Sequence, residues 1–142
     1  MQVRPYLYFN GRCEEAIDFY KKALGAEVIM LLRFKDSADA PPLAMLPGAT
    51  EDKIMHVCFR VGATELMASD GDCEGETGFQ GFSLSISPAN DAEAERLFNA
   101  LADGGEVQMA LEKTFWASSF GLVTDRFGLC WMVSVAEDAV SN

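Results

Sequence analysis

The chain has 142 residues, 49% of them hydrophobic and 23% charged. This length supports one domain with a real core but not two independent domains. The formal net charge of −11 would repel nucleic acid and anionic membranes. No apolar run approaches the ~20 residues that cross a bilayer, and the N-terminus lacks the basic start and apolar stretch of a signal peptide. We therefore expect a cytoplasmic protein that binds neither nucleic acid nor membranes.

The first half of the chain predicts a strand over residues 3–9, followed by a turn and an amphipathic helix that ends at Gly25. A second strand is expected over 27–35. Residues 36–53 contain three prolines and predict a long loop, either a functional flap or a disordered segment. Two further strands, 54–61 and 64–69, read as a tight hairpin.

The second half repeats this order. Residues 71–81 are rich in glycine and read as a linker, and residues 82–87 alternate apolar and serine positions as a half-buried strand does. A helix is expected to open at Asn90, with Glu93 placed as in a capping box, and three strands are expected over 106–111, 115–124 and 129–135. The residues that this helix is expected to bury are Ala94, Leu97, Phe98 and Leu101.

Residues 14–28 and 94–107 both read as a helix, a glycine stop and the opening of a strand. Two such copies indicate two equivalent modules, each too small to bury its own apolar face. The prediction is a single domain over 1–142 that is built from modules of about 1–70 and 81–137.

The four cysteines, Cys13, Cys58, Cys73 and Cys130, form no Cys-x-x-Cys pair, which argues against a zinc site and a thioredoxin-like motif. Cys58 and Cys130 lie in apolar strand patterns, where a thiol is usually a small buried hydrophobe. No disulfide is expected, because the cytoplasm keeps thiols reduced.

Several stretches of the chain resemble the vicinal-oxygen-chelate superfamily, which contains glyoxalase, bleomycin-resistance and extradiol dioxygenase proteins, and within it the PhnB-like branch. The stretches that carry this resemblance are 6–11, 16–20, 24–26, 54–56, 66–70, 114–116, 120–121 and 124–132. The resemblance implies an α+β fold in which two βαβββ modules form an open cup of mixed sheet with the helices outside. It also implies a homodimer, which a high apolar fraction in so short a chain favours.

Metal-dependent members of this superfamily hold a divalent ion with His and Glu residues from the first and last strand of each half. Carried over by the resemblance, these positions fall on Pro5, on Met132, on or near Gly81, and near Leu66 or Met67. None of these can ligate a hard cation, and the chain has a single histidine, His56. We therefore expect the metal site of the superfamily to be lost.

Members of this branch also often carry a 3-demethylubiquinone methyltransferase label. No glycine-rich loop for adenosylmethionine follows a strand in this sequence. The sequence therefore predicts no cofactor.

Without a metal, the implied cup remains a concave, largely apolar surface of the kind that binds small molecules. Trp116, Phe120 and Trp131 lie together on the last strands and favour this interpretation, although each aromatic taken singly also fits ordinary core packing. The candidate lining residues are Tyr6, Tyr8, His56, Ser83, Ser85, Phe115, Trp116, Ser118, Phe120 and Trp131.

Three functions stay open. The first is a small-molecule binding protein with an unknown ligand. The second is a metal-independent lyase, isomerase or transferase in which His56 is a weak candidate for the general base, helped by a carboxylate such as Asp70 or Glu65. The third is a dimeric scaffold without a ligand. The sequence alone leaves open whether any reaction is catalysed.

Overall fold

The computed structural model describes residues 1–36, 50–71 and 76–137. Most of the predicted loop at 36–53 and part of the predicted linker at 71–81 therefore lie outside the described residues. The chain divides into two compact units, Met1–Thr77 (unit 1) and Gly78–Asn142 (unit 2). No helix among the described residues is both long and apolar enough to cross a membrane.

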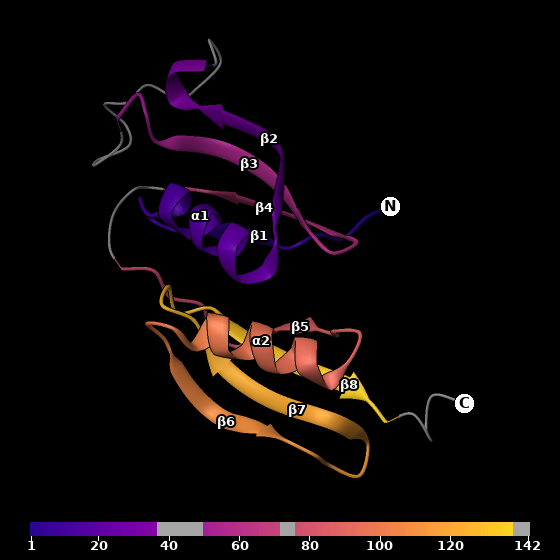
Figure 1. Cartoon of the computed structure of the whole chain (residues 1–142). Coiled ribbons are helices and arrows are strands. Elements are labelled where there is room, and N and C mark those ends of the chain that lie inside the picture. The colour runs from indigo at the N-terminus through magenta and orange to yellow at the C-terminus, as the bar shows by residue number, and fades with distance from the viewer. Residues whose placement is uncertain (37–49, 72–75, 138–142) are drawn as a thin grey trace. The chain divides into compact units, whose positions relative to one another are not determined.

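Each unit has the order strand, helix, three strands (Figure 1), as the sequence predicts. Unit 1 contains β1 (Tyr6–Tyr8), α1 (Cys13–Leu24), β2 (Glu27–Arg33), a 3-10 turn η1 (Phe34–Asp36), β3 (Ile54–Val61) and β4 (Thr64–Ser69). Unit 2 contains β5 (Leu84–Ile86), α2 (Asp91–Ala102), β6 (Glu106–Glu112), β7 (Ala117–Thr124) and β8 (Cys130–Ala136).

The two sheets share one topology. The strand order is β1-β4-β3-β2 in unit 1 and β5-β8-β7-β6 in unit 2. In each sheet the first strand of the unit pairs in parallel with the last, and the other neighbours are antiparallel. The predicted fold class, α+β with two βαβββ modules of mixed sheet, is confirmed.

Helix α1 is fixed by its apolar face and by both of its ends. Its buried residues include Tyr20, whose ring stacks on that of Phe59 in β3 at a centroid distance of 6.4 Å. Gly25 ends the helix in the left-handed conformation that glycine adopts without strain. At the other end, a carboxylate oxygen of Asp70 accepts the backbone N–H of Cys13 over 2.8 Å. Because Asp70 directly follows β4, this bond ties the start of the helix to the sheet.

Helix α2 begins at the predicted cap. The Asn90 side chain accepts the backbone N–H of Glu93 over 2.8 Å, while the Glu93 carboxylate accepts from Ala89 rather than from Asn90. The side chains that α2 buries are the four that the sequence predicts: Ala94, Leu97, Phe98 and Leu101.

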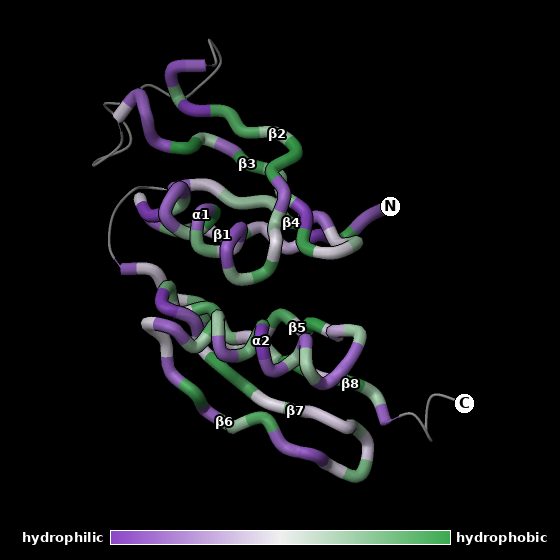
Figure 2. The backbone as a smooth tube through the Cα atoms, in the orientation of Figure 1, coloured by the Kyte–Doolittle hydropathy of each residue, from purple (hydrophilic) through white to green (hydrophobic). Residues whose placement is uncertain are grey.

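Three strands, β1, β5 and β7, begin two or three residues later than predicted, whereas β2 ends two residues earlier and β6 and β8 differ by one residue. β1 and β5 are three residues long, and each pairs along one edge, with β4 or β8. β7 begins at Ala117 rather than two residues earlier. A local turn, in which Thr114 and Ala117 exchange backbone and side-chain hydrogen bonds, holds the preceding residues out of the sheet. The unbroken apolar stretch of β2 is visible in Figure 2.

In each unit the helix covers one face of its sheet. In unit 1 this face carries Leu7, Val57 and Ala68, each at most 2% exposed. The opposite face of each sheet carries no helix of the same unit among the described residues. We call it the helix-free face, and strand alternation assigns residues to one face or the other.

Candidate functional site

The helix-free face of unit 1 brings together one side chain from each of three strands. The hydroxyl of Tyr6 in β1 lies 3.1 Å from Nδ1 of His56 in β3, and their ring centroids are 5.6 Å apart. Ser69, at the end of β4, lies close enough to Tyr6 for its hydroxyl to lower the pKa of the phenol. We call Tyr6, His56 and Ser69 the Tyr6 cluster. Tyr8 lies beside it, with its ring centroid 5.1 Å from that of Tyr6.

The sheet register explains why these residues meet. In the parallel β1–β4 pair, Tyr8 lies opposite Ser69. In the antiparallel β3–β4 pair, Val57 lies opposite Ala68, so the next pair outward aligns His56 with Ser69. The three side chains therefore point to the same side of the sheet.

The polar groups of the Tyr6 cluster are connected to the backbone. The backbone N–H of Gly71 donates to Oγ of Ser69 over 3.1 Å, and the Ser69 hydroxyl keeps a proton that it can donate toward Tyr6. The Tyr6 hydroxyl can then donate to Nδ1 of His56. Burial raises the pKa of Tyr6, although the Ser69 hydroxyl acts in the opposite direction. Tyr6 is therefore protonated at neutral pH and is a donor in this cluster.

This arrangement leaves His56 with a defined chemical character. When Nδ1 accepts from Tyr6, the neutral ring carries its proton on Nε2. His56 then offers an N–H donor to a ligand rather than a free basic lone pair. Next to it, Tyr8 is 57% exposed and offers an aromatic face.

The structure does not place either predicted carboxylate partner beside His56. Asp70 is 1% exposed, and its second oxygen accepts the backbone N–H of Ile54 over 2.6 Å. Its two oxygens are thus used to hold backbone amides. Glu65 forms an ion pair with Arg4 over 3.3 Å. In the structure His56 contacts Tyr6, while the two carboxylates proposed as its helpers, Asp70 and Glu65, have other partners.

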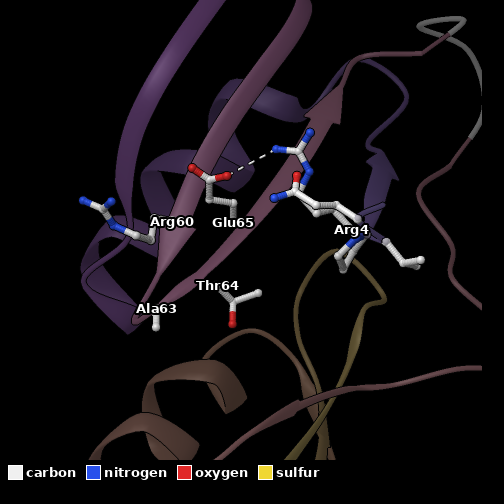
Figure 3. A pocket seen from close by; sticks show the side chains of 8 residues that line it. Arg4, Arg60, Ala63, Thr64 and Glu65 are labelled. Atoms are coloured by element: carbon white, nitrogen blue, oxygen red, sulfur yellow. Dashed lines mark hydrogen bonds and ion pairs between the residues drawn. The ribbon is translucent and has the colours of Figure 1, made fainter.

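A polar hollow of about 440 Å³ lies at the β3–β4 hairpin end of the sheet of unit 1 (Figure 3). It is lined by residues 2–5, Arg60 and residues 63–65, and we call it the Arg4 hollow. Figure 3 shows the Arg4 and Glu65 side chains directed toward one another across it. The sequence does not reveal this hollow, because its two segments lie far apart along the chain and neither carries a motif.

Unit 2, taken by itself, places several of the predicted residues on its helix-free face. Ser85 pairs with Met132, and Phe120 pairs with Ser134. The edge of the Trp116 ring meets Phe120 at a centroid distance of 5.5 Å. Two other predicted residues adjoin this surface: Ser83, whose Oγ lies 3.2 Å from Sγ of Cys130, and Phe115, which is 89% exposed.

Trp131 and Ser118 lie elsewhere. Trp131 pairs with Val123 on the face that α2 covers and is 3% exposed, so it does not point to the helix-free face. Ser118 donates to a carboxylate oxygen of Asp91, the first residue of α2, over 2.6 Å. This bond and one from Ser119 lower the pKa of Asp91. Trp131 thus belongs to the core of unit 2, and Ser118 contacts the first residue of α2.

The donor chemistry of the helix-free faces does not suit the divalent ion that the superfamily implies. Met67 lies beside Tyr6, and Met132 lies beside Ser85. Thioethers and neutral hydroxyls are poor ligands for hard cations. Among residues 1–36, 50–71 and 76–137, no group of three or more His, Cys, Asp or Glu side chains could hold a metal ion.

Two βαβββ units of this topology define the class of vicinal-oxygen-chelate proteins. The fold is similar to that of a glyoxalase-related enzyme from Fulvimarina pelagi, with a TM-score of 0.61 and 14% identity over 95% of this chain and 88% of that one. At this identity the likeness concerns the fold alone. More specifically, the chain belongs to the family described as 3-demethylubiquinone-9 3-methyltransferase, which matches residues 1–134, and to the PhnB-like branch of the superfamily.

Three relatives illustrate this membership. Protein YjdN of Escherichia coli K12 is 36% identical over an alignment of 144 positions, which covers 96% of this chain and 97% of YjdN. Protein PA1353 of Pseudomonas aeruginosa is 47% identical over 97% of this chain and 99% of its own, with a TM-score of 0.81. A Bacillus cereus structure named as a putative 3-demethylubiquinone-9 3-methyltransferase, PhnB protein, is 25% identical over 96% and 100%, with a TM-score of 0.77.

Proposed function

We propose that this chain is a small-molecule binding protein whose ligand lies on the helix-free face of unit 1, against the Tyr6 cluster. The observation that carries the proposal is the 3.1 Å contact of Tyr6 with His56. It places polar groups of fixed direction among the aromatic and thioether side chains of Tyr8 and Met67. Small-molecule sites combine largely apolar walls with a few such polar groups.

Within this proposal the residues have distinct roles. The rings of Tyr6 and Tyr8 give flat surfaces for stacking, and Nε2 of His56 gives a hydrogen-bond donor. The helix-free face of unit 2 is a second candidate surface, with Ser83, Ser85, Phe115, Trp116 and Phe120 as its residues. Trp131 and Ser118 are left out, because Trp131 is buried and bonded to Asp125 in the β7–β8 turn, and Ser118 is bonded to Asp91 at the start of α2.

The proposal includes the loss of the superfamily's metal site. Its support is chemical: the resemblance places the ligands at Pro5, at Met132, on or near Gly81, and near Leu66 or Met67, and none of these side chains ligates a hard cation. The family is described as a methyltransferase, but we do not propose this activity for the chain. Its sequence lacks a glycine-rich loop for adenosylmethionine.

An enzyme that uses His56 as a general base is the second candidate. The specific observation in its favour is again the Tyr6–His56 contact, since a tyrosine and a histidine in contact can relay a proton. A hydrogen bond donated by Tyr6 to Nδ1 favours binding instead, because it occupies that lone pair and leaves the proton of the neutral ring on Nε2.

A thermal-shift screen of a chemically diverse compound set tests the proposal, since a ligand that binds the native state raises the melting temperature. Each hit is then measured with Tyr6→Phe and His56→Gln. The matched control is Tyr20→Phe, which removes a tyrosine hydroxyl from the helix-covered face. We expect the two site variants to lose the shift and the control to keep it. Hits that keep their shift in both site variants would place the ligand elsewhere.

Mass spectrometry of each hit after incubation with the protein separates binding from catalysis. An unchanged compound supports the binding role. Conversion that depends on His56 would instead establish the enzyme.

We also propose a homodimer, which the resemblance to the superfamily implies. Light scattering at low micromolar concentration is expected to give the mass of two chains. A single species of monomer mass would refute this part of the proposal. A dimer for which the full screen yields no ligand would favour the scaffold function.

A further inference from the structure

The Arg4 hollow and the Tyr6 cluster belong to one continuous face of unit 1. A backbone hydrogen bond from Met67 to Pro5 extends the β1–β4 pairing one residue before β1. Arg4 therefore lies on the same side as Tyr6, as its ion pair with Glu65 also shows. Arg60 lies opposite Glu65 in the β3–β4 register. It is on the same face of β3 as His56 and Cys58.

The Arg4 hollow offers an anion the unused donors of Arg4. Its lining contains two guanidinium groups, Arg4 and Arg60, and one carboxylate, Glu65, while Arg60 forms an ion pair with Glu27 of β2 over 2.8 Å. Arg4 is bonded to Glu65 through one nitrogen, and a guanidinium presents five N–H donors. Arg4 can therefore bind a second acceptor without breaking its bond to Glu65. Arginine is well suited to this role, because its planar fork matches the two oxygens of a carboxylate.

The distance between Arg4 and Tyr6 sets the length of a ligand that contacts both residues. Arg4 and Tyr6 are two residues apart on an extended chain, which corresponds to about 6–7 Å. A ring that stacks at Tyr6 and Tyr8 would need a linker of two or three carbons to bring a carboxylate to Arg4.

We propose that the ligand of this face is an aromatic carboxylic acid, whose ring lies at the Tyr6 cluster and whose carboxylate binds Arg4 in the hollow. This inference rests on the proposed function and adds the chemical class of the ligand. Arg4 is the residue that makes the site prefer an acid to a neutral or cationic aromatic compound.

Three probes with one ring test the selection: 4-methylphenol, which is neutral, 3-(4-hydroxyphenyl)propanoate, which is an anion, and tyramine, which is a cation. Calorimetric titrations at 0.15 M salt limit the influence of the distant negative charges, since the Debye length is then about 8 Å. We expect the acid to bind at least about tenfold more tightly than 4-methylphenol, the size of a typical charge-assisted hydrogen bond. Tyramine should show no gain.

Arg4→Ala should remove the gain of the acid and leave the affinity for 4-methylphenol unchanged. Arg96→Ala is the matched control, because it removes the same charge from an exposed position on α2. It should keep the gain. Glu65→Gln removes the carboxylate that competes for Arg4, and the acid should bind more tightly to it.

Several results would overturn the inference: an acid that binds no better than 4-methylphenol, an equal gain for tyramine, or an unchanged gain in Arg4→Ala. The same comparison is repeated with an indole ring, so that the result does not depend on the phenol ring alone. The neutral, anionic and cationic probes are then 3-methylindole, indole-3-propanoate and tryptamine. If the neutral probes bind and the acids gain nothing, the carboxylate site is wrong while the proposed function stands. If none of the six binds, the ligand class is wrong, and the broader screen alone decides the proposed function.

Discussion

The indole nitrogen of Trp131 donates a hydrogen bond to a carboxylate oxygen of Asp125 over 2.9 Å, and both residues are at most 3% exposed. The other oxygen of Asp125 accepts the backbone N–H groups of Phe127 and Leu129. Trp131 therefore helps to fix the turn between β7 and β8 from inside the core of unit 2.

Trp131→Phe should destabilise the protein by about 1–3 kcal/mol, because it leaves a buried carboxylate oxygen without its indole donor. Urea unfolding measures the loss. Trp116→Phe is the matched comparison, since Trp116 is 45% exposed, and it should change stability by less than about 0.5 kcal/mol. Equal effects of the two substitutions would contradict the assignment of Trp131 to the core.

The contrast between these tryptophans shows where the sequence prediction reaches its limit. The order of elements follows from helix periodicity, caps and glycine stops, and all of these are local. The orientation of Trp131 does not follow from local signals. Residues 129–133 are apolar throughout, and the sequence of such a run does not show which residues face which side of the sheet. The alternating stretch at 82–87 gave no such difficulty, and the structure places Ser85 on the helix-free face.

The Tyr6 cluster marks a second limit. Tyr6 and His56 could each be proposed as site residues from their types and strands. Their contact depends on β4 lying between β1 and β3 in a particular register, over a separation of 50 residues. For the same reason Asp70 could be mistaken for a partner of His56, whereas its contacts with Cys13 and Ile54 make it a backbone anchor.

The hydrogen bond between Tyr6 and His56 should appear as a coupling energy. Tyr6→Phe and His56→Gln are each expected to cost about 0.5–1.5 kcal/mol, and the double variant should cost less than their sum. Urea unfolding of the four proteins gives the coupling. Nitrogen chemical shifts should also show the Nε2–H tautomer of His56 in the wild type and a weaker preference in Tyr6→Phe. Strict additivity together with an unchanged tautomer would show that the contact is absent in solution.

The thiol of Cys13 gives a prediction on pH. Burial raises the pKa of Cys13, and the nearby carboxylates of Asp70 and Glu14 add to the shift. The native state therefore keeps a proton that the unfolded chain releases near pH 8.5. This contribution to stability is complete below that pH and decreases as the pH rises beyond it, by up to about 1.4 kcal/mol per pH unit.

Urea unfolding between pH 7.5 and 9.5, in the presence of a reductant, tests this dependence. Cys13→Ala should flatten the decline, whatever its effect on stability at pH 7.5. Cys130→Ala alters a partly exposed thiol and should leave the decline as in the wild type. If Cys13→Ala and the wild type decline in parallel, the buried thiol is not the source.

The proposed loss of the superfamily's metal site predicts that no transition metal co-purifies with the chain. Protein purified without added metal should contain far less than one zinc, nickel, iron or manganese per chain by elemental analysis. Its melting temperature should not change with a chelator, since removal of a bound ion would lower it. Near-stoichiometric metal would revive the metal-dependent enzyme and would direct attention to ligands outside the described residues.

Gly121 in β7 is expected to tolerate no side chain. A Cβ atom there would lie 2.8 Å from Cε2 of Phe98 in α2, 3.0 Å from the carbonyl oxygen of Met109 and 3.2 Å from Cα of Leu111. Two of these atoms are backbone of β6 and cannot move without disturbing the sheet. Gly121→Ala should therefore cost at least about 1–3 kcal/mol, the range for overpacking of a close-packed core.

The matched control is Gly78→Ala, because a Cβ atom at Gly78 meets nothing within 4 Å and the position is exposed. It should be neutral or slightly stabilising, since alanine restricts the unfolded chain. Phe98→Leu removes the nearest side-chain contact and, combined with Gly121→Ala, should recover only part of the loss, because the contacts with Met109 and Leu111 remain. Full recovery would show that α2 alone sets the requirement for glycine, and no loss in Gly121→Ala would place α2 farther from β7 than the 2.8 Å contact implies.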